Sequence, residues 1–322
     1  ICMEIKITAE QANQRVDKFI KRWIKEAPLS FIYKLFRQKD VKVNEKKVDI
    51  KYILQDGDTL FIYLKPDLLE KFKKDYVEKP ISTPLDIIYE DKNIVVVNKP
   101  RGLLIHSDGK DSKFTLANML TSYLIQKGEF NPNNSYGFVP GPCHRLDRNT
   151  TGIVICAKNL PAMQELLALF RDRTQIKKSY TALVYGKLNG SGTINIPLLK
   201  DADKGMVRAG TLKEGAKTAI TEYKRVKQFS NTALVNVELL TGRTHQIRAH
   251  FSLIGHPVVG DGKYGNFEIN KEFEDLYGLK SQFLHAATFS FLKIDGVLSY
   301  LSGMTFEAPL PDHLRKILSD LS

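Results

Sequence analysis

The chain has 322 residues, which at roughly 150 residues per domain is enough for about two domains. Lysine and arginine outnumber aspartate and glutamate by 48 to 36, a formal net charge of +12 that favours a polyanionic partner, although a basic protein without such a partner also fits the charge alone. Three cysteines without a C-x-x-C pair indicate neither a disulfide framework nor a zinc cluster, and no run of about 18 apolar residues is present that could cross a bilayer. We therefore expect a protein of the reducing cytoplasm with no membrane partner, and the opening Ile1–Lys6 lacks the apolar core of a signal peptide.

The positive charge is concentrated near the beginning of the chain. Between Arg15 and Lys47, eleven basic residues stand against four acidic ones, so this segment carries a net charge of +7. Apolar residues recur over residues 12–25 at the spacing of one helical face. They are Val16, Phe19, Ile20, Trp23 and Ile24. The lysines and arginines fall mostly off this stripe, which predicts a helix with a basic face.

Short elements follow this helix. Ser30 can cap a second short helix, alternation around Asn44-Glu45-Lys46 predicts a hairpin over residues 41–48, and Asp56-Gly57-Asp58 turns into a strand over residues 59–64. This pattern of two helices and a small sheet resembles the S4 RNA-binding module, which implies that its basic side chains contact RNA phosphates. An ordinary solvated helix face is the alternative. The side chains that we expect to bind RNA are Arg15, Arg37, Lys39 and Lys42.

A change in composition marks the border of this unit. Residues 66–84 carry three prolines and four lysines and show no sustained apolar period, which indicates a linker. We therefore predict an S4-like domain over residues 1–65, a linker over 66–84 and a second domain over 85–322.

The second domain mixes strand and helix patterns. Residues 94–97 form a continuous apolar run typical of a buried strand, and Thr115 is placed to cap a helix. Alternation over residues 180–185 predicts a strand with Tyr180, Ala182 and Val184 on one face, where a tyrosine is usually a packed aromatic. Residues 200–217 look like a basic hairpin, which either folds over a substrate or is an ordinary surface hairpin.

A polar stripe marks the helix that is predicted over residues 244–255. His245, Arg248 and Ser252 recur at helical spacing, and an arginine on such a face suits a fixed pairing with a carboxylate, unless the face is simply solvated. His245 and His250 are five residues apart without an acidic neighbour, so the spacing of a helical zinc site is not met and we expect no metal.

One aspartate stands among basic and hydroxyl side chains in the run from His144 to Gly152. Asp147 has Arg145 and Arg148 beside it, and an apolar strand pattern follows at once. Nearby positive charge and hydrogen-bond donors favour the ionised carboxylate, which suits a nucleophile or a base. The alternative is a loop aspartate that only stabilises a turn.

This run, His-Arg-Leu-Asp-Arg-Asn-Thr-Thr-Gly, resembles the signature loop of the RluA family of pseudouridine synthases, with Thr151 where the family usually has serine. Three other stretches resemble the family's further motifs in the same order, so that the resemblance covers residues 85 to 318. They are Asn98-Lys99-Pro100-Arg101-Gly102-Leu103-Leu104-Ile105-His106, Lys178-Ser179-Tyr180-Thr181-Ala182-Leu183-Val184-Tyr185-Gly186 and Leu240-Thr241-Gly242-Arg243-Thr244-His245-Gln246-Ile247-Arg248-Ala249-His250.

The resemblance implies a fold, an activity and roles for individual residues. The fold is α+β, a small N-terminal S4-like module followed by a mixed, mainly antiparallel-sheet catalytic domain. The activity is isomerisation of uridine in RNA to pseudouridine without cofactor or metal, with Asp147 attacking or deprotonating the sugar or adding to the uracil. Arg248 pairs with Asp147, Tyr180 stacks on the uracil, and Arg145 fills the space that the uridine vacates. His106, Arg243 and His245 are expected to contact RNA.

The basic N-terminal module joined to this domain resembles the RluC-type branch of the family. This implies structured RNA, and in particular the large-subunit ribosomal RNA rather than transfer RNA, as the partner, and we expect a monomer. Two alternatives stay open: a non-catalytic RNA-binding assembly factor on the same fold, and a hydrolase in which Asp147 and His144 act as an acid–base pair.

Overall fold

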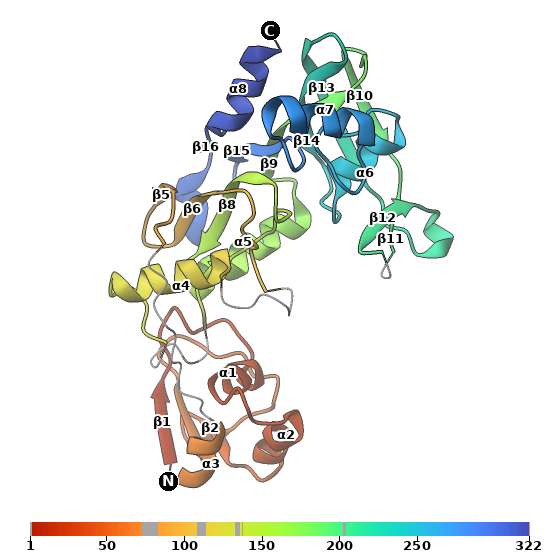
Figure 1. Ribbon diagram of the computed structural model, residues 1–322. Helices are drawn as coiled ribbons and strands as arrows, with labels where there is room; N and C mark the ends of the chain where they lie inside the picture. The colour runs from red at the N-terminus through yellow and green to blue at the C-terminus, as the bar shows by residue number, and fades with distance from the viewer. Residues whose placement is uncertain are drawn as a thin grey trace.

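The computed structural model describes residues 2–72, 83–107, 114–132, 136, 138–201 and 204–321 (Figure 1). A small N-terminal unit, red to orange in Figure 1, precedes a larger unit built on one long sheet. Among the described residues, no helix has both the length and the apolar character needed to cross a membrane.

The N-terminal unit packs helices against a four-stranded antiparallel sheet with the strand order β1-β4-β2-β3. The predicted helical stripe is confirmed, because Val16, Phe19, Ile20 and Trp23 are all buried in the core of this unit. Its elements are β1 (Cys2–Lys6), α1 (Val16–Trp23), α2 (Leu29–Arg37), β2 (Val41–Val43), β3 (Lys46–Lys47), β4 (Thr59–Tyr63) and α3 (Pro66–Phe72).

Two details of this unit differ from the predictions. Ser30 does not cap α2, since the helix begins at Leu29 and Pro28, with an extended backbone, takes the capping position. The segment expected to be a linker begins with α3, whose Phe72 is buried and contacts Phe31 in the N-terminal core. Residues 73–82 of that segment lie outside the described residues.

The larger unit is built on a sheet with the strand order β10-β13-β14-β9-β15-β8-β6-β5, in which only β15 and β8 pair in parallel. The sheet strands are β5 (Ile87–Glu90), β6 (Ile94–Lys99), β7 (Gly141–Pro142), β8 (Thr151–Ala157), β9 (Ile176–Tyr185), β10 (Ser191–Asn195), β13 (Ile220–Gln228), β14 (Thr232–Leu239), β15 (Leu284–Phe291) and β16 (Thr305–Glu307). The mixed, mainly antiparallel α+β fold that we expected is therefore confirmed.

Helices cover both faces of this sheet. They are α4 (Leu116–Gln126), α5 (Leu160–Asp172), α6 (Gln246–Leu253), α7 (Phe267–Tyr277) and α8 (Asp312–Asp320), with 3-10 turns at Leu212–Glu214 and Gly296–Leu301. Thr115 caps α4 as predicted, by accepting a hydrogen bond from the Asn118 amide. Val154 of β8 joins the hydrophobic cluster that contains α4 and α6, whereas Ile153 and Ile155 join the cluster that contains α5, so alternate residues of one strand serve different layers.

The predicted basic hairpin forms from β11 (Leu198–Asp201) and β12 (Met206–Ala209), which make a separate two-stranded sheet, and Leu198 also forms a bridge with Lys217. Figure 1 shows it extending away from the body of the larger unit below α6. Residues 202 and 203 lie outside the described residues.

Gly152 explains how β8 enters the sheet. It pairs with Ala286 of β15 at a φ of +108°, and a Cβ atom there would collide with the Ala286 carbonyl oxygen. Any side chain would therefore separate the two strands directly after the loop that carries Asp147.

Candidate active site

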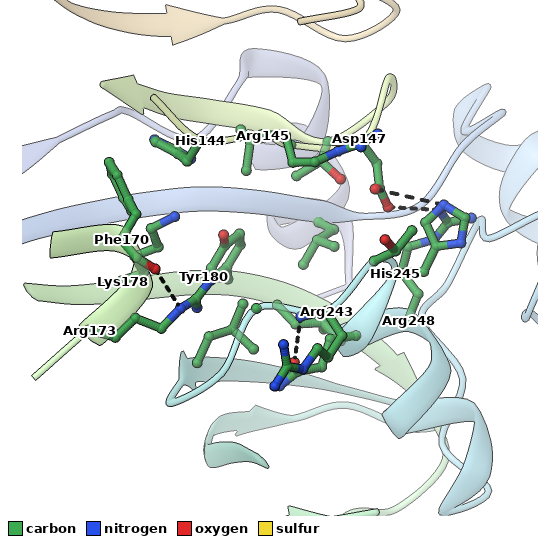
Figure 2. Close-up of a pocket in the computed structure, with 18 of the residues that line it drawn as sticks. His144, Arg145, Asp147, Phe170, Arg173, Lys178, Tyr180, Arg243, His245 and Arg248 are labelled. Carbon is green, nitrogen blue, oxygen red and sulfur yellow. Dashed lines mark hydrogen bonds and ion pairs between the residues drawn. The ribbon is translucent and has the colours of Figure 1, made fainter. Parts of the chain in front are cut away.

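The loop between β7 and β8 carries Asp147 to the wall of a cavity of about 260 Å³ (Figure 2). Leu146 beside it is buried in the core, while the Asp147 side chain is 20% exposed and points into the cavity. Most of the cavity lining comes from the loop before β8, the end of α5, β9, and the turn into α6 with the start of that helix, and Leu239 of β14 and Leu284 of β15 complete it.

Asp147 is paired with an arginine of α6. The Arg248 Nη1 atom donates to Asp147 Oδ2 over 2.8 Å, across 101 positions of sequence. Burial would lower the pKa of the Arg248 guanidinium, but its hydrogen bonds and charge interaction with Asp261, and then with Asp147, hold the pKa above its ordinary value. Arg248 is therefore a fixed positive charge beside Asp147.

Asp261 holds this arginine from behind. Its carboxylate accepts from Arg248 Nε at 2.7 Å and from Nη2 at 2.8 Å, and it also accepts from the backbone amides of Lys263 and Tyr264. Burial would raise the pKa of the Asp261 carboxyl, but Arg248 and these amides hold it below its ordinary value. Sequence reasoning missed Asp261; its setting among Gly260, Gly262 and Gly265 was the available signal.

His245 also faces Asp147, with 3.8 Å between His245 Nε2 and Asp147 Oδ1. Its Nδ1 atom shares a hydrogen bond with the Tyr264 hydroxyl, which in turn accepts from the Val207 amide of the β11–β12 hairpin. Burial lowers the pKa of His245, the Asp147 charge opposing this effect and Arg248 adding to it, so the ring is neutral at pH 7. Strand β12 of the hairpin is thereby connected to the site.

Tyr180 lines the same cavity from β9 and is 6% exposed. It shares one core cluster with Ala182 and Val184, as the predicted strand face requires. Burial raises the pKa of its hydroxyl, which Arg173 opposes and Asp147 reinforces. The side chain therefore presents a neutral phenol to whatever enters the cavity.

The Asp147 loop is held by the first of the motifs quoted above. Lys99 Nζ, fully buried, donates 2.9 Å hydrogen bonds to the carbonyl oxygens of Pro100, Leu103 and Arg148. The Gly102 amide donates to the same Arg148 carbonyl, and Arg148 Nε donates back to the Gly102 carbonyl. Burial lowers the pKa of Lys99 to about 7, against the opposing charge of Asp147, while three carbonyl acceptors match the three hydrogens of an ammonium.

A second cavity, of about 650 Å³, is also lined by Asp147. It shares Arg145, Leu146, Asp147, His245 and Arg248 with the first cavity and adds basic side chains around its wall. These are His106, Arg148, Lys263 and Lys280. Among the described residues that line the two cavities, Asp147 is the only carboxylate.

The predicted site residues fall into three groups. Asp147, Tyr180, Arg248, Arg145, Arg243 and His245 line the first cavity, and His106 lines the second. The four N-terminal residues lie outside both cavities: Arg37 and Lys39 are exposed, Lys42 lies over the Tyr63 ring, and Arg15 is paired with Asp17 through two hydrogen bonds. Arg15 is thus partly occupied within the N-terminal unit.

His144 lines the first cavity, but its ring atoms are engaged away from Asp147. Its ring packs against Phe170 and Phe289, its Nε2 atom accepts from the Ile155 amide, and burial lowers its pKa well below the ordinary value. Within the described part of the chain, His144 and Asp147 share no hydrogen bond, which disfavours an acid–base pair of these two residues. The described residues also contain no group of three His, Cys, Asp or Glu side chains placed to hold a metal ion.

Comparisons with known proteins agree with this geometry. A family model described as RNA pseudouridylate synthase matches residues 93–253. The ribosomal large subunit pseudouridine synthase C of Vibrio vulnificus (strain CMCP6) is 34% identical over 98% of this chain and 96% of its own length, and that of Escherichia coli (strain K12) is 31% identical with the same coverage.

Solved structures show the same fold. The human RNA pseudouridylate synthase domain containing 4 covers 73% of this chain and 92% of its own with a TM-score of 0.58 at 24% identity. The human RNA pseudouridylate synthase domain containing 1 covers 76% of this chain and 97% of its own, with a TM-score of 0.52, also at 24% identity. With relatives this similar along nearly its whole length, the chain belongs to the RNA pseudouridylate synthase family.

Proposed function

We propose that this protein converts specific uridines of large-subunit ribosomal RNA to pseudouridine, with Asp147 as the reacting carboxylate. The observation that carries the proposal is the single carboxylate among the described residues lining the two cavities, held by an arginine and adjoining a buried tyrosine. The large-subunit substrate is inferred from the names of the relatives that match nearly the full chain.

The isomerisation breaks the N1–C1′ bond, forms a C5–C1′ bond, removes a proton from C5 and returns one to N1. Asp147 is the group at the cavity wall that can attack the sugar, deprotonate it or add to the uracil, and Arg248 holds it for that step. The detached uracil has to stay in place while it turns, and Tyr180 offers a flat neutral ring for it to stack on. No cofactor is needed for this balance of atoms.

The uridine has to leave its base stack before Asp147 can reach C1′, at a cost of a few kcal/mol. We propose that Arg145, which is exposed and lines both cavities, fills the vacated space in the RNA. The basic wall of the second cavity, with His106, then contacts the RNA backbone, as do Arg243 and His245 at the turn into α6.

The N-terminal unit is proposed to be an S4-like RNA-binding domain that is joined to the catalytic domain by the segment before residue 85. Its exposed Arg37 and Lys39, with Lys42 and Arg15, contribute phosphate contacts in this account. We propose that the protein acts as a monomer in the cytoplasm, a location that a ribosomal RNA substrate supports.

The test is to incubate the purified protein with transcripts of large-subunit RNA, small-subunit RNA and transfer RNA, digest each to nucleosides and separate pseudouridine from uridine by chromatography. Pseudouridine in the large-subunit RNA alone is the expected result. Pseudouridine only in transfer RNA would contradict the proposed substrate. If no pseudouridine forms in any of the three RNAs or in ribosomal particles, the proposed activity is wrong.

A further inference from the structure

Cationic side chains gather at the end of the first cavity that lies away from Asp147. Figure 2 shows Arg173 and Lys178 on one side of Tyr180 and Asp147 with Arg248 on the other, and Arg243 lies below. We call Arg173, Lys178 and Arg243 the distal cluster. None of the three forms an ion pair with a carboxylate in the described part of the chain, and Asp147 is the only carboxylate among the described residues lining this cavity.

Lys178 is the most buried member of the distal cluster. It precedes Tyr180 by two residues on β9, is 9% exposed, and lies with its ammonium 4.5 Å from the centre of the Phe170 ring. Burial, with a smaller contribution from Arg173, lowers its pKa to about 7. An ammonium without a counter-ion is unfavourable in such a place, so an anion entering the cavity would gain from it.

Arg173 approaches the same space from the end of α5. Its Nε atom donates to the Phe170 carbonyl, and its guanidinium lies against Gly242, where a Cβ atom would collide with Arg173 Nη2. Glycine at position 242 thus leaves room for this guanidinium. Burial lowers the pKa of Arg173, and the nearby positive charge of Arg243 lowers it further, so the two arginines repel each other without a ligand.

Arg243 continues the distal cluster to the surface. Its Nε atom donates to the Thr218 carbonyl, while Gly242, Arg243 and Thr244 are exposed. The cavity is therefore open to solvent at this turn. An RNA strand that enters the cavity beside Asp147 can leave it past Arg243.

We propose that the distal cluster binds a backbone phosphate of a nucleotide that neighbours the target uridine, so that the RNA strand is gripped on both sides of Tyr180. This rests on the proposed function. Planar guanidinium groups bind phosphate oxygens through paired hydrogen bonds, and an ammonium adds a point charge. Two arginines and one lysine around one opening, without an acidic partner among the described residues, suit a phosphodiester.

The first test compares Lys178→Met with Lys177→Met. Lys177 is the neighbouring residue of β9, exposed and 3.4 Å from Glu238, so its variant removes one positive charge from the same strand outside the cavity. The probe is a uridine-containing stem-loop of large-subunit RNA. Lys178→Met should weaken binding by about tenfold to a hundredfold, as expected for a lost charged hydrogen bond, and should make the salt dependence shallower by about one phosphate contact. Lys177→Met should bind as the wild type does.

The second test changes the RNA, so its result on the wild-type protein does not depend on the folding of a variant. Single phosphates on either side of the target uridine are replaced by neutral methylphosphonates. One replacement should weaken wild-type binding and have no further effect on Lys178→Met. The proposal is overturned if no replacement weakens the binding of RNA to the wild type. It is also overturned if Lys178→Met lowers turnover while RNA affinity and its salt dependence stay the same, because the Lys178 charge would then act on the detached uracil. Tritium release by the wild type tests the proposed function separately, since the subsite can fail while turnover persists.

Discussion

At the scale of single side chains, Arg248 is the residue on which the geometry of Asp147 depends. It is 7% exposed and divides its guanidinium between Asp147 at the cavity wall and Asp261 behind it. If one carboxylate partner is removed, the buried arginine keeps its charge but its guanidinium is no longer held in one orientation. Asp261 is therefore a positioning residue that does not itself face the cavity.

Asp261→Asn should lower turnover about a hundredfold, because displacements of about 1 Å near a reacting group can cost that much. The affinity for RNA should stay the same, since Asp261 itself lines neither cavity. Single-turnover tritium release and filter binding measure the two quantities, at a temperature where circular dichroism shows the variant folded. Asp275→Asn, on the exposed surface of α7, is the control. Equal loss of affinity and turnover, or unchanged turnover, would contradict this role.

The distal cluster predicts a pH dependence of RNA affinity. In the free protein the pKa of Lys178 is about 7, and a bound phosphate favours the ammonium and raises it. Binding above pH 7 must therefore take up a proton, so affinity should be highest below pH 7 and fall as the pH rises from 7 to 9. Of the groups facing Lys178, His144 has a strongly lowered pKa, Tyr180 a raised one, and Arg173 stays charged. Titration calorimetry of Lys178→Met should show no such fall in RNA affinity between pH 7 and 9. A fall of equal size in the variant would mean that another group causes it.

At the scale of elements, the paired strands β6 and β8 fix the end of the Asp147 loop that leads into β8. β6 ends at Lys99 and β8 begins at Thr151, and the strands pair up to Lys99 and Gly152. The three carbonyl oxygens around Lys99 Nζ belong to the turn after β6 and to the loop before β8, so one ammonium connects two loops that are about fifty residues apart. The Asp147 loop keeps its position because these hydrogen bonds connect it to the turn after β6.

Lys99→Met should destabilise the protein, because the carbonyls of Pro100 and Leu103 lose their donor. An unsatisfied buried group costs about 1–3 kcal/mol, and relief from burying an ammonium offsets part of the loss. We expect a net loss of about 2–4 kcal/mol and a melting temperature lowered by roughly 5–10 °C. Differential scanning calorimetry measures it, with Lys92→Met in the exposed turn before β6 as the control. An unchanged melting temperature would show that Lys99 is not required to hold the loop.

The elements differ in how far the sequence predicts them. The stripe of α1, the strand face of Tyr180 and the Thr115 cap were predictable, since they depend on neighbours within a few residues. The Asp147–Arg248 pair was predictable only through the family resemblance. Asp261 was not predictable, nor was the grouping of Arg173 and Lys178 with Arg243, which was itself expected to contact RNA, because these contacts form when α5, β9 and the turn into α6 meet in space. Likewise α3 lacked a sustained apolar period, since only Phe72 of this short helix is fully buried.

At the scale of the whole molecule, a basic unit and a catalytic unit divide the proposed work. The segment from Arg15 to Lys47 carries a net charge of +7, and Arg37 and Lys39 at the end of α2 are exposed. The two units touch where the Tyr136 ring stacks on Phe19 of α1 at 5.5 Å. Charge on the first unit should therefore add affinity for RNA without entering the chemistry.

The double variant Arg37→Gln/Lys39→Gln should reduce the salt dependence of RNA affinity by about 1.5 in the slope of log K against log salt, because each phosphate contact contributes about 0.7–0.9. Turnover at saturating RNA should stay unchanged. Lys271→Gln/Lys316→Gln, which removes two exposed charges from α7 and α8, should leave the slope as it is. If both double variants show the same slope of log K against log salt, Arg37 and Lys39 of the N-terminal unit do not contribute to RNA binding.

The most direct test of the account is tritium release from C5-tritiated large-subunit RNA by the wild type, Asp147→Asn and the control Asp275→Asn. Replacing the Asp147 carboxylate by an amide keeps the shape of the side chain and removes the charge that reacts. If Asp147 is the reacting carboxylate, the wild type and Asp275→Asn release tritium, and Asp147→Asn releases none from RNA that it still binds. Release by Asp147→Asn at the wild-type rate would contradict the assignment of the reacting carboxylate.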